Sequence, residues 1–280
     1  MDGMKREEQL AADERLREEQ LAESLAALRA RIADAAAAAG RNPEEIELLP
    51  VTKFFPGSDV AILYELGCRS FGESREQEAA AKSAEVSALV GNSIQWHMVG
   101  HIQRNKARSV AMWASAAHSV DSTRLVGALD RAVVAALTGG RRTQPLDVYV
   151  QVSLDGDPTR GGVDVSSPAA VDEVCDRVAA AGGLSLVGLM AIPPLDSDAD
   201  QAFERLRQEH LRVLASHPEA ARLSAGMSDD LEAAIKHGST CVRVGTALLG
   251  PRPLSSPAVV TPVTSTSSSH QAPNSRRGHR

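Results

Sequence analysis

From residue 46 onward, short apolar runs alternate with longer stretches of helical period. An apolar run of about four to eight residues without polar alternation is typical of a strand that is buried on both faces, as in a parallel sheet. Eight such runs predict strands at residues 46–53, 69–72, 94–99, 116–120, 146–153, 184–190, 221–224 and 240–244.

The stretches between these runs have helical period, and several open on a serine or aspartate that can cap a helix. They predict helices that include residues 58–66, 122–137, 167–181, 198–215 and 228–237. Eight βα units point to an α/β fold, a single closed (β/α)8 TIM-type barrel with an extra N-terminal helix. A doubly wound open sheet is the alternative architecture.

The first part of the chain predicts one long helix over residues 4–39, which Gly40 and Pro43 bring to an end. Its apolar stripe becomes dense only in the second half, at Leu21, Leu25, Leu28 and Ile32. We therefore assign residues 1–19 to a charged helical extension that is frayed and solvated, and residues 20–254 to the barrel. A helix that binds a partner is the alternative interpretation of the extension.

Residues 255–280 are rich in Ser, Thr and Pro and end in an arginine-rich segment. This composition buries too little apolar surface to fold, so we expect a disordered tail. Contact of its basic end with nucleic acid or an acidic partner is an alternative.

Charge and cysteine content exclude several classes of protein. The net charge of −6 argues against nucleic-acid binding, which requires an excess of Lys and Arg on one face. Cys68, Cys175 and Cys241 are odd in number and far apart, so they predict neither a disulfide framework nor a CxxC metal site. The charged N-terminus and the lack of an apolar stretch of about eighteen residues predict a cytoplasmic protein without membrane contact.

Lys53 ends the first predicted strand, and strand C-terminal ends are where (β/α)8 barrels place functional residues. A lysine that leaves an apolar core for a pocket is desolvated, so its amine loses a proton more readily and attacks aldehydes. An ordinary lysine that closes a strand is the alternative.

Two turns after the last two predicted strands can hold an anion. The first, residues 224–228, leads into a helix that we expect Ser228 to open with free backbone N–H groups. In the second, Gly245 permits close backbone approach and Thr246 offers a hydroxyl and an amide. Together they predict a phosphate-binding cup, although each alone also meets the ordinary needs of a βα unit.

Three charged residues flank this cup. Asp229 and Asp230 would repel a phosphate, so we expect both to point outward. Arg243 lies at the end of a buried strand, where a guanidinium requires a carboxylate or a ligand as its partner.

A nucleophilic lysine together with a phosphate cup specifies a small phosphorylated aldehyde, and pyridoxal 5′-phosphate fits that description. Seven segments carry a family likeness: VTK ending at Lys53, FGES from Phe71 with Gln77 and Glu78, WHMVGHIQRNK from Trp96, HSVDS from His118, GLMAIP from Gly188, LSAGMSDDLEAAI from Leu223 and GSTCVRVGTALLG from Gly238. Through them, residues 20–254 resemble the YggS-type (PROSC-type) pyridoxal phosphate homeostasis proteins, relatives of the N-terminal barrel of alanine racemase.

The resemblance implies a fold-type III pyridoxal phosphate barrel with an internal aldimine at Lys53 and phosphate contacts from Ser228, Gly245 and Thr246. It also places Arg243 against the pyridine nitrogen, where a guanidinium keeps that nitrogen unprotonated and weakens the ring as an electron sink. We predict no catalytic residue and no metal site, and the predicted cofactor-binding set further includes Ser224, Gly226 and Met227.

Some positions depart from the family pattern or suggest other chemistry. Ser74 stands where the family has asparagine, and Phe54 stands where a small polar residue is common, which would make the pocket floor more apolar. His97 and His101 are four residues apart, but a predicted strand holds the first, so a metal site is a minor alternative. We expect His118 to be a hydrogen-bonded histidine at a strand end.

The resemblance favours a non-catalytic, monomeric protein of intracellular vitamin B6 homeostasis that passes pyridoxal phosphate to apo-enzymes requiring it. A pyridoxal-phosphate-dependent amino-acid racemase is the alternative. Racemases of this type take a second base, a tyrosine, from an extra β domain that we do not expect here, and neither Tyr64 nor Tyr149 is predicted at the barrel mouth. A third hypothesis is an adaptor that uses its N-terminal helix and basic tail.

Overall fold

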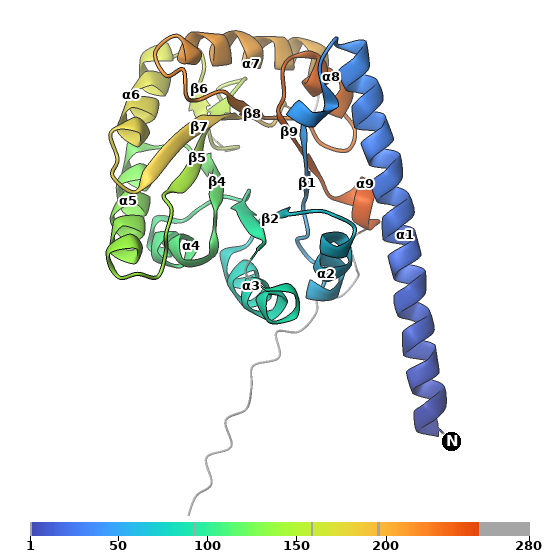
Figure 1. Cartoon of the computed structure of the whole chain (residues 1–280). Helices are drawn as coiled ribbons and strands as arrows, with labels where there is room; N and C mark the ends of the chain where they lie inside the picture. Colours follow the sequence, from blue (N-terminus) through green and yellow to red (C-terminus); the bar gives the residue numbers. More distant parts are fainter. Residues whose placement is uncertain (1, 92, 158, 195–196, 252–280) are drawn as a thin grey trace, which may run out of the picture.

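The computed structural model describes residues 2–91, 93–157, 159–194 and 197–251 of the 280-residue chain. Within these ranges, eight parallel strands follow one another around a barrel that helices surround (Figure 1). The barrel strands are β1 (Glu47–Pro50), β2 (Ser70–Glu73), β3 (Gln95–Met98), β4 (Ala116–Val120), β5 (Leu146–Ser153), β7 (Leu184–Met190), β8 (Arg222–Ser224) and β9 (Cys241–Val244); the two-residue β6 (Val163–Asp164) pairs with β5 alone.

The barrel closes where the first and second strands meet. Strand β1 pairs in parallel with β9 over its whole length, and on its other side Val51 forms a parallel bridge with Gly72 of β2. The Thr52 amide also donates to the Gly72 carbonyl at 2.9 Å. This closure confirms the predicted (β/α)8 barrel, and the alternative of an open sheet is wrong.

The helices of the described ranges are α1 (Asp2–Ala38), α2 (Gly57–Glu65), α3 (Glu76–Val90), α4 (Ala107–Trp113), α5 (Thr123–Thr138), α6 (Pro168–Ala179), α7 (Ala199–Leu214), α8 (Leu231–Lys236) and α9 (Thr246–Leu249), with short 3-10 turns at Pro43–Glu45 and Arg104–Lys106. The side chain of Asp198 caps α7 by accepting from the amides of Asp200 and Gln201. None of these helices combines the length and the apolar character that a membrane crossing requires.

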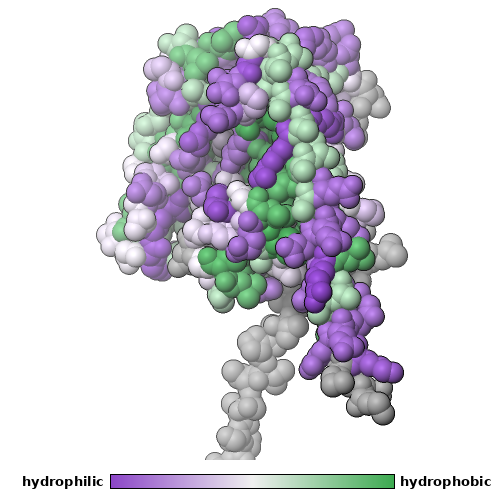
Figure 2. Space-filling model, turned by 45° about the vertical axis from the view of Figure 1, so that its right-hand side comes forward, coloured by the Kyte–Doolittle hydropathy of each residue, from purple (hydrophilic) through white to green (hydrophobic). Residues whose placement is uncertain are grey.

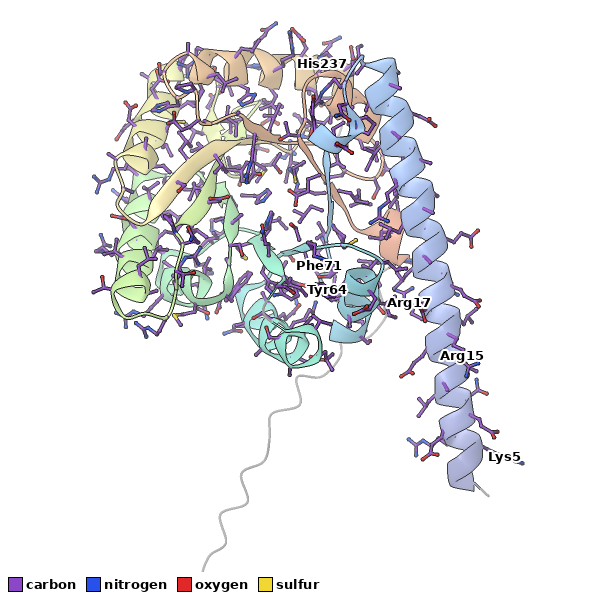
Figure 3. The ribbon with its side chains drawn as sticks, viewed as in Figure 1. Lys5, Arg15, Arg17, Tyr64, Phe71 and His237 are labelled. Atoms are coloured by element: carbon purple, nitrogen blue, oxygen red, sulfur yellow. The ribbon has the colours of Figure 1, made fainter. Side chains whose placement is uncertain are left out.

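Helix α1 lies along the outside of the barrel, and its N-terminal half projects beyond it (Figure 1). The predicted stripe is buried, with Leu21, Leu25, Leu28 and Ile32 each at most 5% exposed. Docking begins one turn earlier than predicted, because the Arg17 guanidinium pairs with Asp59 of α2 at 2.6 Å and donates to the Leu249 carbonyl. Figure 3 shows Arg17 turned toward α2, whereas Lys5 and Arg15 lie on the projecting part.

The projecting part of α1 is hydrophilic over most of its surface (Figure 2). The structure shows it as continuous helix from Asp2, so the frayed extension remains a prediction for residues 1–19. The predicted tail, residues 255–280, lies outside the described residues.

The barrel interior is unusually polar. Many buried apolar side chains belong to two large clusters, and Ala116, Tyr149 and Met190 form a small separate one. Buried histidine, serine and arginine side chains lie inside the barrel and hydrogen-bond one another.

Candidate cofactor-binding site

Lys53 lies in a turn just beyond β1. The regular strand ends at Pro50, and Val51 continues the pairing by its single bridge to β2. The prediction of a strand through Lys53 is therefore three residues too long, and the side chain is exposed instead of desolvated. The physical reason is the turn itself, in which the Phe55 amide donates to the Thr52 carbonyl at 3.1 Å and directs the chain away from the barrel.

The turns after β8 and β9 lie against each other, as the sequence predicts. The Ala247 amide donates to Ser228 Oγ at 3.4 Å, which joins the two turns. A Cβ at Gly245 would lie 3.5 Å from the carbonyl oxygen of Val51, so the β9 turn also borders the end of β1. The Thr246 amide, at the first position of α9, has no intrahelical acceptor, and together with the Ser228 hydroxyl it forms a set of donors suited to an anion.

The β8 turn differs from its prediction in two details. Helix α8 begins at Leu231, so Ser228 does not open it. The Met227 amide is not free, because it donates to Asp230 Oδ1 at 2.6 Å. Asp230 thus folds back over the turn instead of pointing outward, whereas Asp229 is exposed as expected. The carboxylate satisfies an amide that the predicted cup would have offered to an anion.

Gly226 fixes the shape of this turn. Its φ is +89°, and a Cβ there would lie 2.6 Å from the Cβ of Ala234 in α8. We expect Gly226→Ala to lower the free energy of unfolding by about 2–4 kcal/mol through left-handed strain plus overpacking. Gly238→Ala is the matched control, since Gly238 has a φ of +98° but nothing within 4 Å, and it should lose only about 1 kcal/mol. Equal losses in urea unfolding would contradict this account of Gly226.

Arg243 lies inside the barrel, 6% exposed. Its Nη1 donates to Ser224 Oγ at 2.6 Å and its Nη2 to the Ala191 carbonyl at 3.0 Å. No salt bridge of the described residues includes it, and burial lowers the pKa of the guanidinium. A buried cation that is held only by neutral acceptors is suited to donate to a neutral ring nitrogen.

A chain of hydrogen bonds continues from Arg243 across the interior. His118 Nδ1 lies 2.8 Å from Ser224 Oγ, and His118 Nε2 lies 3.1 Å from His97 Nδ1. Burial is the main cause that lowers the pKa of both imidazoles. The prediction that His118 is hydrogen-bonded is confirmed, although it sits in the middle of β4.

The remaining candidates lie apart from the mouth. His101 is exposed, and the described residues contain no group of three or more ligands that could hold a metal. Tyr149 is fully buried and stacks on His118 with ring centroids 4.2 Å apart, whereas the Tyr64 hydroxyl contacts Ser93 at 2.6 Å. Neither tyrosine reaches the carboxyl ends of the strands.

Sequence reasoning missed a charged pair behind the Lys53 turn. Glu73 ends β2, Lys82 lies on α3, and both contact Thr52. A lysine in an alanine-rich helix carries no sign of burial in the sequence, because its role depends on the strand end that it faces.

Comparison with known proteins identifies the family of the chain. Residues 24–253 match the family model described as the alanine racemase N-terminal domain. The chain belongs to this family. It is 65% identical over 247 residues to the pyridoxal phosphate homeostasis protein of Mycobacterium leprae (strain TN), covering 86% of this chain and 96% of that protein. With the Escherichia coli (strain K12) protein of the same name it shares 38% identity over 235 residues, 83% of this chain and 97% of that protein.

A solved structure of a relative also matches. PipY of Synechococcus elongatus PCC7942, determined with PLP bound, is 33% identical in sequence to this chain and superposes with a TM-score of 0.70. The match covers 82% of this chain and 100% of PipY. The resemblance inferred from the sequence segments is thus confirmed. Within the alanine racemase N-terminal domain family, the chain groups with proteins named for pyridoxal phosphate homeostasis and not with racemases.

Proposed function

We propose that this chain binds pyridoxal 5′-phosphate at the carboxyl ends of β1, β8 and β9, attaches it covalently to Lys53, and serves cytoplasmic pyridoxal phosphate homeostasis without catalysis. The observation that carries the proposal is the joining of three strand ends at one edge of the barrel. Ser228 contacts the β9 turn, and Gly245 borders the end of β1, two residues before Lys53. PipY, which was solved with PLP bound, shares this fold.

The residues present fit the cofactor. The Ser228 hydroxyl and the hydroxyl and amide of Thr246 would hold the phosphate, with Gly226 giving the turn its shape and Gly245 leaving room. Met227 lines the same turn, 36% exposed, with its amide already bonded.

Deeper in the barrel, Arg243 would donate to the pyridine nitrogen, and Ser224 would position Arg243 through its hydroxyl. Lys53 is exposed beside the mouth and can reach a ligand there. When bound, pyridoxal phosphate would supply an aldehyde, and the Lys53 amine would be the group of this chain that bonds to it, with loss of one water.

The same residues argue for carriage over racemisation. A racemase needs proton-transfer groups on both faces of the substrate, and Tyr64 and Tyr149, the two tyrosines of the chain, both lie away from the mouth. The permanently charged Arg243 disfavours a protonated ring nitrogen. A monomer that releases its cofactor to apo-enzymes is consistent with an attachment lysine that is exposed.

The test is to map where the cofactor attaches. We expect protein incubated with pyridoxal phosphate, reduced with borohydride and digested to carry about one cofactor, on the peptide that contains Lys53. The visible absorption band of the unreduced protein should disappear on reduction. A label spread evenly over exposed lysines, or absent, would refute the proposed function.

A further inference from the structure

We propose that a buried network of Thr52, Glu73 and Lys82 positions the backbone of Lys53 for reaction with an aldehyde at the barrel mouth. The inference rests on the proposed function, because it concerns how the attachment lysine is held. The three residues come from the end of β1, from β2 and from α3, whereas the phosphate cup comes from β8 and β9. The network therefore affects the covalent step separately from phosphate binding.

Every polar group of Thr52 is hydrogen-bonded. Its amide donates to the Gly72 carbonyl at 2.9 Å and its hydroxyl to Glu73 Oε1 at 2.7 Å. Its carbonyl accepts from Lys82 Nζ at 2.8 Å and from the Phe55 amide at 3.1 Å. Thr52 is 0% exposed, so water does not compete for these partners. The residue before the attachment lysine is thus fixed to both a strand and a helix.

Lys82 and Glu73 form an ion pair that is shielded from solvent. Lys82 Nζ lies 2.6 Å from Glu73 Oε1, and the two side chains are 10% and 0% exposed. Charge-assisted hydrogen bonds of this kind are shorter and stronger than neutral ones. Because Lys82 binds the Thr52 carbonyl and Glu73 binds the Thr52 hydroxyl, the contacts close into a ring around one residue.

The turn that follows has a conformation that bulky residues rarely adopt. Phe54 has a φ of +69° and is the one non-glycine residue with a positive φ in the described ranges. The bond from Phe55 to Thr52 closes a turn with Lys53 and Phe54 at its centre, an arrangement that favours glycine at the second central position. Such strain persists where the surroundings fix the backbone, and here the ring around Thr52 fixes one end of the turn.

These contacts affect one of the two steps of cofactor capture. The first step is binding of the phosphate by the β8 and β9 turns, and the second, which the contacts affect, is reaction of the Lys53 amine with the aldehyde. With the backbone fixed on one side and strained on the other, Lys53 Nζ can reach only a limited region of the mouth. Loss of the network lets the peptide between Thr52 and Lys53 rotate, so attack on an aldehyde slows although the phosphate is held as before. A purely structural role would instead weaken the fold and the whole mouth together.

The experiment compares the rate of borohydride-trapped labelling by pyridoxal phosphate with the affinity for pyridoxine 5′-phosphate, which has no aldehyde. We expect Thr52→Val and Lys82→Met to slow labelling of Lys53 by about 10-fold to 100-fold, with pyridoxine phosphate affinity changed by less than about threefold. Thr52→Ser should retain the wild-type rate. Val133→Ala, in the distant α5 core, should lower the melting temperature and leave labelling unchanged.

A wild-type labelling rate in Thr52→Val would overturn the inference. Thr52→Val keeps the test decisive if Lys82→Met does not fold, because it removes only the hydroxyl that donates to Glu73 and leaves the pair of Lys82 and Glu73 in place. A loss of pyridoxine phosphate affinity in parallel with the labelling rate would also overturn it, since the network would then support the mouth as a whole. If wild-type protein takes no label at Lys53, the proposed function fails and the inference falls with it.

Discussion

Lys53→Ala is expected to abolish the borohydride-stable label and to weaken binding of pyridoxal phosphate by about 100-fold, which corresponds to about 2.8 kcal/mol. Lys53 supplies the amine at the mouth, whereas the phosphate donors come from Ser228 and the start of α9. The variant therefore loses the covalent bond and keeps the phosphate contacts. Intact mass after reduction measures the first, and titration with pyridoxine 5′-phosphate measures the second.

Lys106→Ala is the matched control for this variant. Lys106 also follows a barrel strand, in the 3-10 turn Arg104–Lys106, and pairs with Glu76 at 3.2 Å, but it is not part of the edge formed by β1, β8 and β9. We expect the control to label as the wild type does. If Lys53→Ala still takes one cofactor per chain, another lysine is the attachment point and the assignment of Lys53 is wrong.

The fold was predictable because it depends on periodicity. Each of the eight predicted strands has a counterpart, and their order along the chain is their order around the barrel. The Leu21 to Ile32 stripe of α1 is likewise buried. Parallel neighbours follow directly from βα units, so an apolar pattern of this kind specifies both the elements and their sequence in space.

The details of the turns were not predictable from the same pattern. Asp230 could point outward or fold back onto the Met227 amide, and only the course of the turn decides between the two. Ser228 has the residue type of a helix cap, but α8 begins three residues later. Capping propensity identifies candidate residues, whereas tertiary contacts select which amide each oxygen accepts from.

The hydrogen-bond partners of buried polar side chains were also not predictable from the sequence. The sequence placed Arg243 at a strand end and indicated its need for a partner. It did not show that Ser224 accepts from Arg243 and also bonds to His118, 106 residues away in the sequence. Pairing across a barrel interior depends on register, which the strand pattern leaves open. The polar interior is thus the part of the site that the structure adds.

This interior should make the stability of the protein depend on pH. Arg243 can only donate, so the Ser224 hydroxyl proton is available to His118 Nδ1, and neutral His118 then donates from Nε2 to His97. Burial is the main cause that lowers the pKa of both histidines. Nearby His97, Arg243 and Arg222 lower the pKa of His118 further. Glu47 and Asp147 partly oppose the downward shift of His97, whereas Arg222 adds to it. Both imidazoles are therefore neutral in the folded protein at pH 7.

Acidification should destabilise the fold well before its carboxylates titrate. A histidine in the unfolded chain has a pKa of about 6.5. Below that pH the unfolded chain therefore binds protons at His97 and His118, whereas the folded protein, in which both pKa values are lower, does not yet bind them. The stabilisation is fully present above about pH 6.5 and is lost as the pH falls toward the lowered folded values. Each histidine contributes a limiting slope of about 1.4 kcal/mol per pH unit. The free energy of unfolding should thus fall steeply between about pH 6.5 and 5.

His118→Gln tests this dependence directly, because an amide can hydrogen-bond in the interior without titrating. Its slope of unfolding free energy against pH, from urea titrations at pH 7 to 5, should be smaller than that of the wild type by about 1.4 kcal/mol per unit. His101→Gln is the control, since His101 is exposed and should leave the slope unchanged. An unchanged slope in His118→Gln would mean that His118 carries its proton inside the folded barrel. In that case Ser224 would accept from both His118 and Arg243, with two adjacent charges sharing one hydroxyl.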